Sequence, residues 1–157
     1  MTSLVLFYSR TGTTKKIAEL ISEKLSCDYE EIFDTKNRQG FFGWLRSGKD
    51  AMRKKLTILK KINKNPALYD LIIIGTPIWA SNMSPPIRTY ITQNKDNIKN
   101  VAFFCTEGSK GGENCFKKLA DLSEKEPVAT LEIKRKDIKK DTHLEKINEF
   151  IQEIKKS

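Results

Sequence analysis

The sequence predicts a single α/β domain over residues 1–157, with a doubly wound, five-stranded parallel sheet between two layers of helices. Two observations support this prediction. The runs at 4–7, 71–74 and 101–104 are apolar at consecutive positions, as is typical of strands buried on both faces. Each run leads into a loop rich in hydroxyl or glycine residues and then into helical periodicity. Strands that alternate with helices in this way favour a parallel sheet.

The first strand is expected at residues 3–8. A helix follows and runs to about residue 26, because apolar residues recur at helical spacing, namely Ile17, Leu20, Ile21 and Leu25. Residues 28–33 form a weaker, partly polar strand, which suits a position nearer the edge of the sheet.

Residues 39–61 are the least regular part of the chain. Leu45, Met52, Leu56 and Leu59 lie at spacings of seven, four and three, which predicts one helical stripe. An aromatic cluster framed by glycines precedes this stripe, with the sequence Gly40-Phe41-Phe42-Gly43-Trp44. The favoured interpretation is a helix entry that packs into the core. The alternative is a mobile aromatic flap near a ligand, or a patch that contacts a partner.

The second half of the chain repeats the alternation. A break at Asn65-Pro66 precedes the strand at 71–74, and Pro85-Pro86 suits the first turn of the next helix. The remaining elements are a strand at 101–104, a helix marked by Phe116, Leu119 and Ala120, an alternating edge strand at 128–133, and a final helix striped by Leu144, Ile147, Ile151 and Ile154. Right-handed crossovers place the five strands in one parallel sheet.

Three loops follow the three most apolar strands, and they are expected to meet where the carboxyl ends of the strands lie. The first, at 9–14, combines four hydroxyls with Gly12 at a helix start. Unpaired amides at a helix start attract anions, so this loop suits a phosphate. It lacks both the G-K-[ST] ending of a P-loop and the spaced glycines of a dinucleotide fingerprint. A terminal phosphomonoester is therefore the expected anion.

The pattern Phe7-x-Ser9-x-x-Gly12-x-Thr14-x-x-x-Ala18-x-x-Ile21 resembles the signature of the flavodoxin family. The resemblance implies the sheet order 2-1-3-4-5 and an FMN cofactor, with its phosphate in the loop at 9–14. It also implies that Trp79 flanks the isoalloxazine ring and that the loop at 106–112 supplies backbone donors to the ring edge. The residues expected to bind FMN are Ser9, Arg10, Thr11, Gly12, Thr13, Thr14, Thr76, Pro77, Ile78, Trp79, Asn82, Thr106, Glu107, Gly108, Ser109 and Gly111.

The sequence departs from electron-carrier flavodoxins in three respects. Residues 106–112 contain no aromatic residue to cover the second face of the ring, which leaves that face open, or covered by residues 41–44 or by a second subunit. Carriers often have glycine after the inner aromatic, whereas this chain has Ala80, for which a left-handed backbone costs about 1–2 kcal/mol. Finally, carriers are typically acidic, whereas this chain has a net charge of +9.

The function expected from these features is electron transfer by an FMN-binding protein. The alternative is an NAD(P)H-dependent FMN reductase of quinones or other small acceptors, because Gly75-Thr76-Pro77 followed by Asn82-Met83 resembles the loop of flavodoxin-like quinone reductases. No catalytic side chain is expected. A regulatory phosphate-binding domain is disfavoured, because the strand ends carry Ser9, Thr76 and Thr106 rather than clustered aspartates.

The cysteine content and the net charge limit which metals and partners can be expected. Cys27, Cys105 and Cys115 have neither zinc spacing nor an even number to pair, so free thiols and no metal are expected. The charge of +9 allows nucleic acid or a membrane surface, but the basic residues are dispersed, and solvated helix faces are the favoured explanation. The expected partner is a redox protein or a small-molecule acceptor, and the charge would select an acidic one. A cytoplasmic monomer or homodimer is expected, with no nucleic acid or membrane as a partner.

Overall fold

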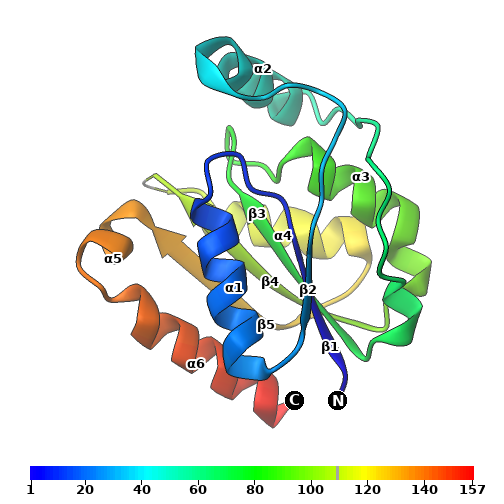
Figure 1. Cartoon of the computed structure of the whole chain (residues 1–157), viewed down its shortest axis with the longest axis vertical. Coiled ribbons are helices and arrows are strands. Elements are labelled where there is room, and N and C mark those ends of the chain that lie inside the picture. The colour runs from blue at the N-terminus through cyan, green and yellow to red at the C-terminus, as the bar shows by residue number, and fades with distance from the viewer. Residues whose placement is uncertain (109) are drawn as a thin grey trace.

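Figure 1 shows a computed structural model of the chain, which describes residues 1–108 and 110–157. One five-stranded sheet lies at its centre in the order β2-β1-β3-β4-β5. Its strands are β1 (Ser3–Phe7), β2 (Asp28–Glu31), β3 (Leu71–Pro77), β4 (Asn100–Glu107) and β5 (Pro127–Lys134), and all neighbouring pairs are parallel. The predicted order 2-1-3-4-5 is thus confirmed.

Helices cover both faces of this sheet. They are α1 (Thr13–Leu25), α2 (Gly40–Met52), α3 (Pro85–Asn94), α4 (Gly112–Ser123), α5 (Arg135–Lys139) and α6 (His143–Lys156), with the 3-10 turns η1 (Pro66–Leu68) and η2 (Lys95–Asn97). Residues from α1 and α6 form one core cluster with the sheet, and residues from α3 and α4 form the other (Figure 1). The chain therefore has the predicted three layers. None of the described helices has the length and apolar content needed to cross a membrane.

The pleat explains why consecutive apolar residues are needed in the central strands. Leu4 and Leu6 of β1 belong to the cluster with α3 and α4, whereas Val5 and Phe7 belong to the cluster with α1 and α6. Both faces of β1, β3 and β4 are buried in this way. Strands β2 and β5 lie at the two edges, as their more polar sequences predict.

The prediction for residues 39–61 is wrong in two respects. Helix α2 ends at Met52, so Leu56 and Leu59 lie beyond it rather than on its stripe. In addition, the aromatic cluster does not enter the core. The side chains of Phe41, Phe42, Trp44, Leu45 and Met52 are all exposed.

The buried face of α2 carries small and polar residues instead, namely Gly43, Ser47, Asp50 and Ala51. A Cβ atom at Gly43 would overlap the backbone of Arg38, so only glycine allows this close approach. The Ser47 hydroxyl donates to the Gly43 carbonyl at 2.7 Å, and Asp50 accepts from Lys36 at 3.1 Å. Close backbone packing and buried polar contacts, rather than the spacing of apolar residues, thus determine which face of α2 is buried. Helix α2 lies at the end of the molecule opposite both termini (Figure 1).

Candidate functional site

The loop between β1 and α1 turns sharply before the helix begins. Gly12 has φ 94°, in the left-handed region that favours glycine, and its amide donates to the Ser9 hydroxyl at 3.1 Å. Helix α1 starts at Thr13, where the first amides have no partner within the helix and carry partial positive charge. The side chains of Thr11 and Thr13 are exposed beside these amides. The loop can therefore receive an anion.

Thr14 has a different role from its neighbours. Its side chain is buried, and its hydroxyl lies 2.7 Å from the hydroxyl of Thr106 at the end of β4. The Thr106 carbonyl in turn accepts from the amide of Ile78 at 3.0 Å, in the loop after β3. Thr106 thus links all three loops that follow the central strands.

The loop after β3 contains a tight two-residue turn at Ala80 and Ser81. The amide of Trp79 donates to the carbonyl of Asn82 at 2.9 Å, and the amide of Asn82 donates back at 3.0 Å. Ala80 has φ 49° and Ser81 has φ 56°, so both occupy the left-handed conformation that such a hairpin turn requires. Ala80 therefore already adopts the backbone conformation that its side chain disfavours.

Side chains hold this turn in place. The Asn82 side-chain amide donates to the Ala80 carbonyl at 3.1 Å, and the Lys118 ammonium donates to the Ser81 carbonyl at 3.1 Å. The Thr76 hydroxyl accepts from the Ser84 amide at 3.0 Å at the base of the loop. The loop is therefore a built structure rather than a loose connection.

Trp79 is fixed between two neighbours and is 9% exposed. Its ring meets the Tyr8 ring edge to face, with centroids 5.5 Å apart, and the Arg38 guanidinium carbon lies 5.7 Å from its centroid. Arg38 is itself buried and donates from Nε to Asp34 at 2.9 Å and from Nη1 to Asp50 at 3.4 Å. This network joins the Trp79 loop to α2.

Glu107, at the end of β4, has a buried carboxyl group with a side-chain exposure of 2%. Burial raises its pKa to about 7, and the nearby Glu132 carboxylate adds to the effect. Lys134 lies between them, 3.2 Å from Glu132 and 3.9 Å from Glu107. The Gly112 amide at the start of α4 donates to Glu132 at 3.1 Å. Glu107 is thus the carboxyl of this pair that is still partly protonated at neutral pH.

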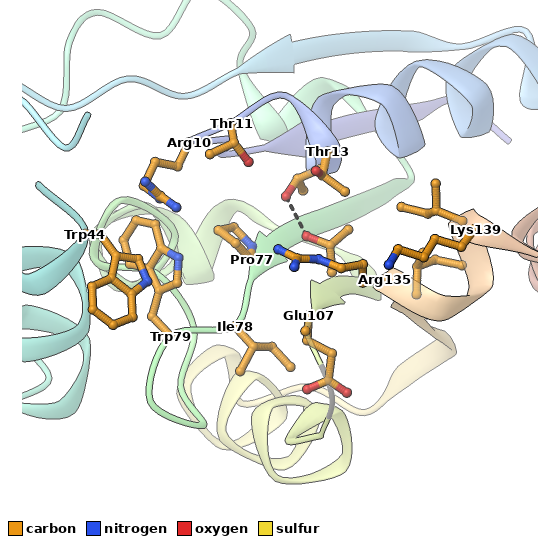
Figure 2. Close-up of a pocket in the computed structure, with 15 residues that line it drawn as sticks. Arg10, Thr11, Thr13, Trp44, Pro77, Ile78, Trp79, Glu107, Arg135 and Lys139 are labelled. Carbon is orange, nitrogen blue, oxygen red and sulfur yellow. Dashed lines mark hydrogen bonds between the residues drawn. The ribbon is translucent and has the colours of Figure 1, made fainter. Parts of the chain in front are cut away.

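The three loops surround a cavity of about 420 Å³ at the carboxyl ends of the strands (Figure 2). Ten of the predicted residues line it, namely Arg10, Thr11, Thr13, Thr14, Pro77, Ile78, Trp79, Thr106, Glu107 and Gly108. Five residues complete the wall, namely Trp44, Ile133, Arg135, Ile138 and Lys139. Of these five, only Trp44 lies in a segment that the sequence associates with the ligand, through the interpretation of residues 41–44 as a flap or cover. The other four come from β5 and α5, which carry no recognisable ligand motif.

The remaining predicted residues lie behind or beside this wall. Ser9 and Gly12 shape the first loop, Thr76 and Asn82 brace the second, and Gly111 adopts φ 129° just before α4. Ser109 lies outside the described residues. All three cysteines are free, and the described residues contain no cluster of potential metal ligands.

The sheet order and the cavity define a doubly wound ligand-binding domain. The chain belongs to the flavodoxin family, whose family model, described as flavodoxin, matches residues 2–153. No curated protein matches the chain.

Several solved structures are similar. One is a flavoprotein in complex with FMN from Lactobacillus acidophilus, 23% identical, covering 90% of this chain and 97% of that chain, with TM-score 0.71. A Bacteroides uniformis protein assigned as a flavoprotein is 28% identical and covers 88% of this chain and 96% of that chain, with TM-score 0.70. A flavodoxin from the domain Archaea is 19% identical. The match covers 99% of this chain and 98% of that chain, with TM-score 0.55.

Proposed function

We propose that this chain binds FMN in the cavity and acts as an electron-transfer flavoprotein. The observation that carries the proposal is the meeting of an anion-attracting helix start and a fixed tryptophan at one cavity of about 420 Å³. That volume lies in the usual range of about 300–1,000 Å³ for small-molecule sites. Membership of the flavodoxin family and the FMN complex of a similar fold support the same cofactor. Bound FMN supplies the redox chemistry, and the protein binds, orients and tunes it.

The phosphate would be held at the start of α1. The hydroxyls of Thr11 and Thr13 and the free amides of the first helical turn are available there. Figure 2 shows Arg135 and Lys139 on the same side of the cavity as Thr13, and the two tryptophans on the opposite side. These two cations add positive charge where a phosphate dianion needs it.

The isoalloxazine ring would lie toward Trp79. The contacts with Tyr8 and Arg38 fix the Trp79 ring, so that side chain has little conformational freedom to lose on binding. Trp44 of α2 also lines the cavity, whereas Phe41 and Phe42 do not. This supports a role as ligand cover for Trp44 alone within residues 41–44.

Charges at the cavity favour a negatively charged reduced cofactor. Arg10, Arg135 and Lys139 line it, whereas the one acidic lining residue, Glu107, is only partly ionised near pH 7 because burial raises its pKa to about 7. Each cation near the ring contributes about 1 kcal/mol or less through water. The reduction potential is therefore expected to be higher than in a protein with an acidic flavin site.

Anaerobic stopped-flow mixing of the FMN-loaded protein with NADH, with NADPH and with dithionite tests the electron-transfer role. A carrier is expected to show no flavin bleaching with either nucleotide, full reduction by dithionite, and rapid reoxidation by ferricyanide. Free FMN at the same concentration is the matched control, because it reports the background reaction of each reagent.

The second candidate is an NAD(P)H-dependent reductase of quinones or other small acceptors. It is favoured by the lack of aromatic residues at 106–112, which leaves the second ring face without an aromatic cover from that loop. A nicotinamide or quinone ring would reach the flavin on that face. Rapid bleaching with either nucleotide, followed by quinone-dependent turnover, would select this candidate over the carrier.

A further inference from the structure

Helix α2 presents its large apolar side chains to solvent. The exposed fraction is 83% for Phe42, 67% for Phe41, 53% for Trp44 and 48% for Leu45. We call these four residues the aromatic face of α2. The opposite side of the helix is already packed against the protein through small and polar residues, so the aromatic face has no place in the core of this chain. Contiguous exposed apolar side chains of this kind mark interaction surfaces.

The surroundings of the aromatic face are strongly basic. Every exposed side chain between residues 41 and 56 is either apolar or cationic, and the cationic ones are Arg46, Lys49, Arg53, Lys54 and Lys55. Asp50 is the single acid in this segment, and it is buried and paired with Lys36, Arg38 and, at 3.9 Å, Lys55. The surface thus offers bulky apolar groups together with an excess of positive charge.

This two-component surface limits what can cover it. A second copy of the chain would bring its own basic residues against these and would be repelled. The centres of protein interfaces are depleted of lysine and acidic residues, whereas lysines and arginines lie directly beside this apolar face. The surface of an anionic bilayer supplies both complements at once, with acyl chains for aromatic and aliphatic groups and phosphates for lysine and arginine.

We propose that the aromatic face of α2 docks this protein on an anionic lipid surface. Phe41, Phe42 and Leu45 enter the boundary between headgroups and acyl chains, and the basic residues of α2 and its C-terminal flank contact the lipid phosphates. Figure 1 places α2 at the end of the molecule opposite the termini, where it can reach a flat surface. This attachment replaces both the solvated-face explanation for residues 41–56 and the expectation of no membrane partner, and it does not depend on the bound cofactor.

Docking through α2 also determines where the cavity lies relative to the lipid. Trp44 belongs both to the aromatic face and to the wall of the cavity. Docking through α2 therefore brings the mouth of the cavity to the lipid surface, within reach of small acceptors dissolved in the bilayer.

Co-sedimentation with large unilamellar vesicles tests the proposal. The full chain is mixed at 0.1 M salt with vesicles of pure phosphatidylcholine or with 30 mol% phosphatidylglycerol. We expect binding to the anionic vesicles, and we expect the double variant Phe41→Ser/Phe42→Ser to lower the partition coefficient about tenfold or more. Both phenylalanines are exposed, so the variant should unfold at the same urea concentration as the wild type.

Two charge variants separate specific docking from general attraction. Lys49→Ser/Arg53→Ser removes two charges at α2, and Lys155→Ser/Lys156→Ser removes two exposed charges from the end of α6. The net charge changes equally in both. We expect the first variant to weaken vesicle binding at least about fivefold and the second to change it less than about twofold.

The two tryptophans provide an internal comparison. In a Trp79→Phe chain, Trp44 is the sole tryptophan, and its emission should shift to shorter wavelength on addition of anionic vesicles. In a Trp44→Phe chain, the emission of buried Trp79 should not shift.

Three results would overturn the proposal. One is no binding of the wild type to anionic vesicles. Another is equal weakening by the two charge variants, which would show undirected attraction of a basic protein. The third is self-association, or binding to a small acidic ferredoxin, that Phe41→Ser/Phe42→Ser abolishes while vesicle binding persists in that variant. This last result would assign the aromatic face to a second copy or to an acidic protein.

Discussion

The hydroxyl of Thr14 lies 2.7 Å from the hydroxyl of Thr106, although 92 residues separate them in the chain. Thr14 belongs to the first turn of α1 and Thr106 to the end of β4, so one buried hydrogen bond connects the anion-attracting loop with the loop on the far side of the cavity. The Thr106 carbonyl extends the connection to Ile78. The relative position of the three loops is therefore set by contacts within the protein itself.

This link makes a prediction about stability. Thr14→Val or Thr106→Val leaves one buried hydroxyl without its partner, and each is expected to lower the free energy of unfolding by about 1–3 kcal/mol. The double variant should lose less than the sum, with a coupling of about 1 kcal/mol. Urea unfolding measures all three. Thr13→Val, at an exposed neighbour, should change stability by less than about 0.5 kcal/mol, and strictly additive losses at 14 and 106 would contradict the direct contact.

Arg38 carries a second prediction, because it is buried between Asp34 and Asp50. Arg38→Met removes the buried cation that pairs with Asp34 and also contacts Asp50, and it is expected to cost about 3–5 kcal/mol in urea unfolding. Lys36→Met removes a half-exposed partner of Asp50 and should cost about 0–1 kcal/mol. Similar effects of the two changes would show that burial does not set the strength of this network.

The sequence predicts the central strands and the loops that follow them well, and it predicts α2, α5 and the contacts of the edge strand β5 less well. Consecutive apolar residues in β1, β3 and β4 are typical of strands buried on both faces, and the residues that follow such strands meet at one edge of a parallel sheet. Ten of the predicted residues line the cavity for this reason. Trp79 can be recognised from the sequence as a candidate binding residue, because a large aromatic side chain in such a loop has too much apolar surface to remain exposed to water.

Other features depend on contacts that no local pattern encodes. Arg135, Ile138 and Lys139 line the cavity because α5 follows the edge strand β5 directly, and their sequence resembles an ordinary basic helix. The inverted burial of α2 arises from the close approach of Gly43 to Arg38, which outweighs the apolar stripe. The pairing of Glu107 with Glu132 requires the register between β4 and β5, which periodicity does not reveal.

That carboxyl pair makes stability depend on pH. The pKa of Glu107 is about 7 in the folded chain against an ordinary value of 4.5, so between these pH values the folded state binds a proton that the unfolded state has released. Stability should therefore fall as pH rises through this window. Lys134 opposes the rise in the Glu107 pKa without cancelling it, whereas the Gly112 amide donates to Glu132 and keeps that second carboxyl ionised.

Glu107→Gln isolates this contribution, because glutamine cannot ionise. Relative to the wild type, the variant should become progressively more stable as urea unfolding is repeated from pH 4.5 to pH 8. Lys134 contacts both carboxyls, and Lys134→Met should steepen the wild-type loss. A constant difference between Glu107→Gln and wild type across this range would show that Glu107 titrates normally.

At Ala80, replacement by glycine is expected to stabilise the protein, whereas Ala→Gly changes usually destabilise it. Its φ of 49° is strained for any residue with a Cβ atom. Ala80→Gly is therefore expected to raise the free energy of unfolding by up to about 1 kcal/mol, after allowing for the greater freedom of glycine in the unfolded chain. Ala120→Gly, within helix α4, should instead lower it by about 1 kcal/mol. Equal losses at both positions would contradict the left-handed turn.

The central claim is that residues 9–14 hold the phosphate of FMN, and titration of the full chain with FMN and with riboflavin tests it most directly. The two ligands share the ring and differ in the phosphate, which is expected to gain at least two charge-assisted hydrogen bonds of about 1.5–3 kcal/mol each. Quenching of flavin fluorescence should therefore show one FMN site at least about 100-fold tighter than riboflavin. Thr13→Val should weaken FMN binding and leave riboflavin binding unchanged. Equal affinities for the two flavins, or no binding of FMN, would contradict the account.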